Sequence, residues 1–443
     1  MWFDDITVAK ADGTVLPHQT VVVRDTRIAY VGPDRPAQDE GERVEGSGRL
    51  LMPGLVNAHT HVAMTLMRGY GDDLPLDTWL TGRIFPFEDK LTGEDVYWGS
   101  LLGMAEMIAT GTTSFTDMYY FCDRIAEAAL ACGIKANIGR GISCFDPAKS
   151  FRDLPAYGEI RELLSSMQGA GEGRIRIDVA PHSEYTTRPD ILYDAAALAA
   201  ETGARMQVHL SETSKEQLEC VARHGKTPAQ LLKDTGVLEN PVTLAHCVWL
   251  TELDMDLIAV ARDATIAHCA KSNLKLGSGI AQVKKWGEWG IPAAIGTDSA
   301  ASNNALDMFE EMRTASLLAK GIDRDPLALP AAKTLYMATR AGALSQGRET
   351  AGDIVPGYQA DLVLVDLETP SMTPCHSAVS NLVYAANGGA VRMTMVDGRI
   401  LYRDGRFLTL DIDEVRARAA EAVRAVQARG IGGNWQFNQE NMR

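Results

Sequence analysis

The sequence has few cysteines, no excess of positive charge and no long apolar run. Its seven cysteines, spread over 443 residues, include no CxxC pair, which argues against a disulfide scaffold and predicts a reducing, cytoplasmic location. Lys and Arg total 43 against 58 Asp and Glu, a net charge of −15, so no nucleic-acid partner is expected. Without a run of about 18 apolar residues, no membrane span is expected. The first residues, MWFDDITVAK, lack the basic and apolar regions of a signal peptide.

What the chain does contain is ordinary core-forming material. Hydrophobic residues make up 46% of it and charged residues 23%, a composition typical of globular proteins. At roughly 150 residues per domain the length suggests about three domains, but α/β barrels often exceed about 250 residues as one unit. The order of strand-like and helix-like segments must therefore decide the organisation.

Both ends of the chain are rich in short strand-like runs. FDDITVA, QTVVVRD and RIAYVG lie near the N-terminus, and ADLVLVDL, VRMTMVDG and RILYRDG lie near the other end. The pairs Asp397-Gly398 and Asp404-Gly405 are strong hairpin signals. We therefore expect residues 1–52 and 350–410 to form one small β-sandwich domain. The last segment, 411–443, is predicted to be a C-terminal helix followed by a tail.

Residues 53–349 have a different sequence pattern, in which short apolar runs alternate with longer helical stretches. This alternation is typical of βα units and a parallel sheet. Eight parallel strands in about 300 residues fit an α/β fold of the (β/α)8 TIM-like barrel type better than an open sheet. The eight runs are GLVNAHTH, TTSFTDM, KANIGRG, IRIDVAPH, RMQVHLSE, VTLAHCVW, TIAHCAK and PAAIGTDS.

Polar residues gather where these predicted strands end. In a barrel of this type the catalytic groups lie at the C-terminal ends of the strands. Six of the nine histidines in the chain fall there, a concentration that chance does not readily explain. The residues at the predicted strand ends are His59, His61, Asp117, Arg140, His182, His209, His246, His268 and Asp298.

The first strand ends in His59-Thr60-His61, which predicts a metal site. Residues i and i+2 of a strand point to the same side, so the two imidazoles can bind one ion. His209 on strand five offers a third imidazole, and Asp298 on strand eight offers a carboxylate. Such ligands suit zinc, with iron or manganese as alternatives. The competing interpretation is a pair of histidines that only hydrogen-bond to backbone carbonyls.

Five motifs together resemble the amidohydrolase superfamily: PGLVNAHTHVAMTLMRG, HLSET, LAHCVWL, SNLKLGSG and IGTDS. Within it the chain is similar to the branch of methylthioadenosine/S-adenosylhomocysteine deaminases and triazine hydrolases, over nearly its whole length. The resemblance implies one divalent metal ion per subunit, held by His59, His61, His209 and Asp298. Dinuclear members of the family use a carboxylated lysine on strand four. This chain has APHS there, so a mononuclear site is implied.

The resemblance also implies the reaction, hydrolytic deamination of an adenine ring to the hypoxanthine form with release of ammonia. Asp298 would accept the proton of the attacking water, and His246 would hold this nucleophile in line. Glu212, in HLSET, would protonate a ring nitrogen as general acid. The alternative for Glu212 is a solvated loop carboxylate. The implied substrates are 5'-methylthioadenosine, S-adenosylhomocysteine and adenosine-type nucleosides.

Further residues are implied to bind the substrate. Glu88 would contact the ribose hydroxyls and His182 the sugar side, whereas Arg140 and Arg152 would meet the far end. Two arginines suit an amino-acid carboxylate, which guanidinium binds in a bidentate fork. Surface ion pairing is the alternative for both. The resemblance further implies a homo-oligomer, a dimer or a tetramer.

Two competing functions remain from the sequence. A guanine or 8-oxoguanine deaminase, or a triazine hydrolase, would use the same metal site on another ring. A catalytically silent binding or scaffold protein would be expected to have lost ligands or Glu212, and all of these are present.

Overall fold

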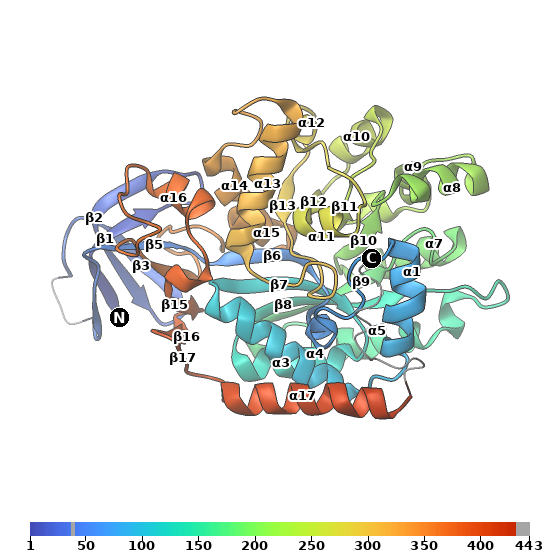
Figure 1. Ribbon diagram of the computed structural model, residues 1–443, viewed down its shortest axis with the longest axis horizontal. Coiled ribbons are helices and arrows are strands. Elements are labelled where there is room, and N and C mark those ends of the chain that lie inside the picture. The colour runs from blue at the N-terminus through green and yellow to red at the C-terminus, as the bar shows by residue number, and fades with distance from the viewer. Residues whose placement is uncertain (37–39, 431–443) are drawn as a thin grey trace, which may run out of the picture.

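The computed structural model describes residues 1–36 and 40–430. Within them the strands form two sheets, a parallel barrel sheet in the middle of the molecule and a mixed sheet at one end (Figure 1). Helices surround the barrel sheet. The expected α/β fold, a TIM-like barrel with a β-sandwich built from both termini, is confirmed. None of the described helices has the length and apolar character needed to cross a membrane.

The barrel sheet has the eight strands predicted from the sequence, in sequential order and all parallel. Most of their residues are buried, as expected for a parallel sheet covered by helices. The strands are β6 (Leu55–Thr60), β7 (Thr112–Tyr119), β8 (Lys135–Ile142), β9 (Ile175–Pro181), β10 (Met206–Leu210), β11 (Val242–His246), β12 (Ala264–His268) and β13 (Ala293–Ile295).

The last strand returns to the first and nearly closes the barrel. The backbone amide of Asp298 donates a hydrogen bond of 2.9 Å to the carbonyl of His59, and the amide of Thr297 donates to Oδ1 of Asn57 at 2.9 Å. A Cβ on Gly296 would lie 2.8 Å from the backbone nitrogen of His59, so this close approach requires glycine. Closure therefore brings Asp298 beside the paired histidines.

The helices that follow the strands pack outside the barrel sheet (Figure 1). Several begin with capping boxes, such as Thr92 with Asp95 and Thr251 with Asp254, which satisfy the free amides of the first turn. These helices are α3 (Gly93–Ala109), α4 (Cys122–Cys132), α5 (Pro155–Ser166), α6 (Ala170–Gly173), α7 (Pro189–Thr202), α8 (Ser214–His224), α9 (Pro228–Asp234), α10 (Glu252–Ala259), α11 (Ala270–Lys275), α12 (Val283–Glu288), α13 (Met308–Asp323), α14 (Ala331–Ala338) and α15 (Arg340–Ser345).

Short helical segments lie at the C-terminal mouth of the barrel sheet. The segment from 76 to 88, which we call the cover segment, consists of α1 (Leu76–Trp79), the π-helix η2 (Leu80–Ile84) and α2 (Phe85–Glu88). The 3-10 helices η1 (Val62–Met67) and η3 (Phe151–Asp153) follow β6 and β8, whereas η4 (Val237–Glu239) lies between α9 and the start of β11, at the other end of the strands.

The mixed sheet joins the two ends of the chain. β5 runs parallel to β1 and antiparallel to β14, with Leu51 opposite Leu364. The strands of the mixed sheet are β1 (Trp2–Ala9), β2 (Val15–Arg24), β3 (Arg27–Gly32), β4 (Arg43–Glu45), β5 (Arg49–Pro53), β14 (Leu362–Asp366), β15 (Val391–Val396), β16 (Arg399–Arg403) and β17 (Arg406–Phe407). α16 (Ala378–Tyr384) and η5 (Gly388–Ala390) lie between β14 and β15. The domain limits at 52, 350 and 410 stay a prediction.

The helix α17 (Ile412–Ala428) follows the mixed sheet and runs along α3 (Figure 1). Asp411 caps it by accepting hydrogen bonds from the amides of Asp413 and Glu414, both at 3.1 Å. Its buried side chains, Val415, Ala419, Ala422 and Val426, recur every three to four residues and form one apolar stripe. The expected tail after this helix, 431–443, lies outside the described residues.

Candidate active site

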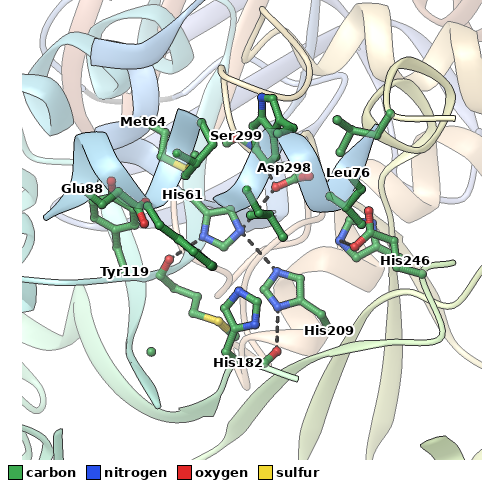
Figure 2. A pocket seen from close by; sticks show the side chains of 18 of the residues that line it. His61, Met64, Leu76, Glu88, Tyr119, His182, His209, His246, Asp298 and Ser299 are labelled. Carbon is green, nitrogen blue, oxygen red and sulfur yellow. Dashed lines mark hydrogen bonds and ion pairs between the residues drawn. The ribbon is translucent and has the colours of Figure 1, made fainter. Parts of the chain in front are cut away.

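The barrel mouth holds all six histidines that the sequence placed at strand ends. They are His59 in β6, His61 directly after β6, His182 directly after β9, His209 in β10, His246 at the end of β11 and His268 at the end of β12. His268 lies apart from the cluster and packs edge-on against Trp286, with ring centroids 5.5 Å apart. Rings of the other five lie near one another, and Figure 2 shows His61 and His209 turned toward each other beside Asp298.

The predicted metal ligands converge at this point. Nε2 of His61 lies 3.3 Å from Nε2 of His209 and 3.4 Å from Oδ1 of Asp298. Nε2 of His59 lies 3.8 Å from the same oxygen. Ligand atoms of His59, His61 and Asp298 fall within 4.8 Å of one another, and so do those of His59, His209 and His246. The two groups share His59, so His246 is close to the same centre.

Hydrogen bonds orient two of these imidazoles for metal binding. Nδ1 of His61 lies 2.5 Å from the carbonyl oxygen of Met118, and Nδ1 of His209 lies 2.7 Å from that of His182. A carbonyl only accepts, so each Nδ1 carries the proton and each Nε2 presents a lone pair to the centre. Nε2 of His59 is buried and has no hydrogen-bond partner among the described residues. This donor set fits a divalent metal ion.

Burial and neighbouring groups determine the protonation states of the histidines and of Asp298 in the cluster. It lowers the pKa of His59 and of His209 well below the usual range, which keeps both imidazoles neutral. Burial alone would raise the pKa of Asp298, but the imidazoles of His61 and His246 outweigh it and hold that pKa at about 2. Asp298 is therefore ionised at neutral pH.

Serine hydroxyls fix the orientation of the Asp298 carboxylate. Ser272 and Ser302 donate to Oδ2 at 2.5 and 2.9 Å, and the Ser299 amide donates to Oδ1 at 2.7 Å. The backbone of Asp298 has a φ of +59°, a left-handed conformation that is costly for a residue with a side chain. The surrounding contacts thus hold this carboxylate in one position at the end of β13.

Glu212 and His246 face each other at the other side of the cluster. Oε2 of Glu212 lies 3.8 Å from Nε2 of His246, and Oε1 accepts a hydrogen bond of 3.1 Å from Ser278. Nδ1 of His246 is held by Oδ1 of Asn273 at 2.8 Å. Because Glu212 is only 5% exposed, burial raises its pKa. It is therefore no solvated loop carboxylate, and its environment favours holding a proton.

A cavity above the cluster, which we call the inner cavity, is lined on one side by the cover segment. Its polar lining consists of His61, His182, His209, Glu212, His246 and Asp298, together with Glu88, Tyr119, Tyr120, Tyr185 and Ser299. Its apolar lining includes Met64, Leu76, Trp79, Leu80, Ile84, Phe85 and Leu276. In Figure 2, Glu88 and Leu76 of the cover segment and Met64 of η1 lie around the histidines. Such a cavity suits a flat ring with a few convergent polar groups.

The family of this chain follows from a comparison of its sequence with models of protein families. The model described as the amidohydrolase family matches residues 50–401. This chain belongs to the amidohydrolase family. The resemblance inferred from the five motifs is confirmed, and so is the expectation of a hydrolase. Family membership and the His/Asp cluster together indicate a divalent metal site in this amidohydrolase.

Relatives and solved structures resemble this amidohydrolase over most of its length. A 5-methylthioadenosine/S-adenosylhomocysteine deaminase of Moorella thermoacetica is 42% identical over 95% of this chain and 98% of its own. A 5'-deoxyadenosine deaminase of Methanothermobacter thermautotrophicus is 43% identical over 91% of this chain and 94% of its own. The structure of an adenosine deaminase from Xanthomonas campestris with bound zinc matches with a TM-score of 0.90 at 34% identity. The match covers 96% of this chain and 98% of the deaminase chain. An atrazine chlorohydrolase from Arthrobacter aurescens, at 22% identity and TM-score 0.89 over 95% and 99%, shows the fold alone.

The residues expected to contact substrate fall in three different places. Glu88 and His182 line the inner cavity. Arg140 lines a larger neighbouring cavity of about 970 Å³, which we call the outer cavity. Arg152 is exposed on η3, where its guanidinium stacks over Tyr157 at 5.5 Å. The contact of Arg152 with substrate stays a prediction.

The structure adds site residues to which the sequence had given no role. Ser272 holds Asp298, Asn273 holds His246 and Ser278 holds Glu212. All three lie in SNLKLGSG, so the motif itself was the available signal. Apart from Glu88, the cover segment from 76 to 88 had no comparable signal, because its place over the cavity depends on the tertiary fold.

Proposed function

We propose that this amidohydrolase is a metal-dependent hydrolytic deaminase of adenine nucleosides. The substrates we propose are 5'-methylthioadenosine, S-adenosylhomocysteine and adenosine-type nucleosides, including 5'-deoxyadenosine, and the products are the hypoxanthine form and ammonia. The observation that carries the proposal is the buried Glu212, with its raised pKa, opposite His246 beside the metal cluster. The names of the relatives from Moorella thermoacetica and Methanothermobacter thermautotrophicus support it.

The proposed metal ligands are His59, His61, His209 and Asp298. We propose zinc as the ion, with iron or manganese as alternatives, because three imidazoles and one carboxylate suit these metals. When bound, such an ion lowers the pKa of a water molecule and so supplies the nucleophile at neutral pH. The bound zinc of the Xanthomonas campestris adenosine deaminase supports this choice.

Two carboxyl groups of the protein then transfer protons, and one histidine orients the nucleophile. Asp298, ionised because its pKa is about 2, accepts the proton of the attacking water. His246, whose ring is fixed by Asn273, orients the nucleophile. Glu212 donates its proton to a ring nitrogen of adenine, and its raised pKa makes it suitable for this task. Asp298 then passes its proton to the amino group, the bond between the ring carbon and this nitrogen breaks, and ammonia leaves. The proton of the added hydroxyl group returns to Glu212, which leaves the ring in the hypoxanthine form.

The remaining contacts position the nucleoside. We propose that Glu88 accepts hydrogen bonds from the ribose hydroxyls and that His182 contacts the sugar. Arg140 and Arg152 are proposed to lie toward the 5' substituent. The outer cavity shares the lining residues Phe85, Glu88, Tyr120 and His182 with the inner cavity, and we propose that a 5' substituent follows a path along them. A free base would not need this path, which favours a nucleoside over guanine, 8-oxoguanine or a triazine.

A panel of substrates tests the function directly. Adenosine, 5'-methylthioadenosine, 5'-deoxyadenosine, S-adenosylhomocysteine, guanine, 8-oxoguanine and a triazine would each be incubated with the metal-loaded protein. We expect loss of the adenine absorbance and stoichiometric ammonia with the nucleosides. Turnover of guanine, 8-oxoguanine or the triazine without turnover of any nucleoside would overturn the proposal. The expected homo-oligomer and the cytoplasmic location stay predictions.

A further inference from the structure

Tyr120 lines both the inner and the outer cavity. The guanidinium of Arg140 stacks over the Tyr120 ring at 4.8 Å. The residue after Arg140, Gly141, lines the inner cavity. Arg140 therefore stands where the 5' substituent of a nucleoside would leave the inner cavity, and its charge bears on which substituents can enter.

The guanidinium of Arg140 already has partners. Its Nε donates to Oε2 of Glu159 in an ion pair, and its Nη1 donates to the carbonyl oxygen of Gly141. Bidentate recognition of a carboxylate uses two parallel N–H groups of the fork. An incoming carboxylate must therefore displace Glu159 or share the guanidinium with it.

The outer cavity is acidic around this ion pair. Its lining contains the six acidic residues Glu88, Asp89, Asp123, Glu127, Glu159 and Glu162, and among the described residues Arg140 is its one Lys or Arg. Glu88 adds little charge at pH 7, because burial raises its pKa to about 8, so the other five acids carry the negative charge. Arg124 pairs with Glu127, which offsets one of these charges. Arg152 lies outside this lining. The excess of negative charge opposes the entry of a carboxylate.

We infer that Glu159 determines the specificity of this site by neutralising Arg140, so that the enzyme prefers nucleosides whose 5' substituent carries no carboxylate. The inference rests on the proposed function. In this arrangement 5'-methylthioadenosine and 5'-deoxyadenosine are better substrates than S-adenosylhomocysteine. Glu159 acts through Arg140 and is not itself required for the chemistry.

The test is the ratio of kcat/KM for S-adenosylhomocysteine to kcat/KM for 5'-methylthioadenosine. In Glu159→Gln the freed Arg140 should raise this ratio about 10-fold or more, the usual scale of a charge-assisted hydrogen bond. Glu162→Gln is the matched control, because it removes a charge of the same sign from the same cavity. It should change the ratio less than about threefold.

A double variant, Arg140→Met with Glu159→Gln, guards against misfolding caused by an unpaired guanidinium. Its ratio should remain within about threefold of the wild type, since both charges of the pair are removed. A 10-fold fall would show that Arg140 binds the carboxylate in the wild type and would overturn the inference. An unchanged ratio in folded Glu159→Gln would also overturn it. So would an equal rise of the ratio in Glu159→Gln and in the control Glu162→Gln. If no adenine nucleoside is deaminated by the wild type, the proposed function itself fails, which is a different result.

Discussion

The carboxylate of Glu216 accepts hydrogen bonds from the backbone amides of Ser211 and Glu212, at 2.8 and 2.7 Å. Glu216 lies in the first turn of α8, and Ser211 follows β10 with a φ of +49°. The buried carboxylate thereby fixes the turn that presents Glu212 to the inner cavity. Glu216 is a positioning residue for the proposed general acid.

Glu216→Gln should therefore lower kcat without removing the metal. The amide keeps the shape of the side chain, but its NH2 group cannot accept from a backbone amide, so one of the two hydrogen bonds is lost. A shift of Glu212 by about 1 Å costs on the order of 10- to 100-fold in kcat, whereas KM should change little. Steady-state kinetics and metal content measure both. Glu219→Gln, on the same helix but 50% exposed, is the control; a parallel fall in metal content would contradict the positioning role.

His61→Ala should reduce the bound metal from about one ion per chain to a small fraction, because three ligands hold an ion less tightly than four. Elemental analysis of the purified protein measures this directly. His18→Ala is the control, since the His18 side chain is 82% exposed and pairs with Asp5. Full metal occupancy in the His61 variant would exclude His61 from the ligand set.

Glu212→Gln should lower kcat by about 100-fold or more while the metal stays bound. A glutamine cannot donate the proton that the buried carboxyl is placed to give, and a positioned proton donor contributes on this scale. Single-turnover rates with 5'-methylthioadenosine, combined with metal analysis, provide the measurement. Turnover near that of the wild type would assign the proton transfer to another group, with Asp298 as the first candidate.

Glu88 gives a prediction on pH. Burial raises the pKa of Glu88 to about 8, although the nearby Tyr119 hydroxyl lowers it in part. The carboxyl is mostly protonated at pH 7 and mostly ionised at pH 9, and the ionised form is the better acceptor for two ribose hydroxyls. KM for nucleosides should therefore fall about 10-fold between pH 7 and pH 9. Glu88→Gln should remove this dependence; a pH profile shared by both proteins would reject the assignment.

The sequence alone predicted the barrel and proposed a set of metal ligands. Eight apolar runs separated by helical stretches reflect a periodicity that is local in the chain, so counting them gave the strands of the parallel sheet. His59 and His61 share a face because strand geometry repeats every two residues. The motifs around His209 and Asp298 are equally local, and their resemblance to known amidohydrolases supplied the proposed roles.

The tertiary structure decided which distant side chains meet. Closure of the barrel brings Asp298 beside His59, and the cover segment from 76 to 88 folds over the inner cavity. The ion pair of Arg140 with Glu159 joins residues 19 positions apart. The sequence left open whether the guanidinium binds a substrate carboxylate or forms an ion pair, and the structure shows it paired with Glu159. Such pairings depend on how β8 and α5 pack against each other, and no spacing along the chain encodes that distance.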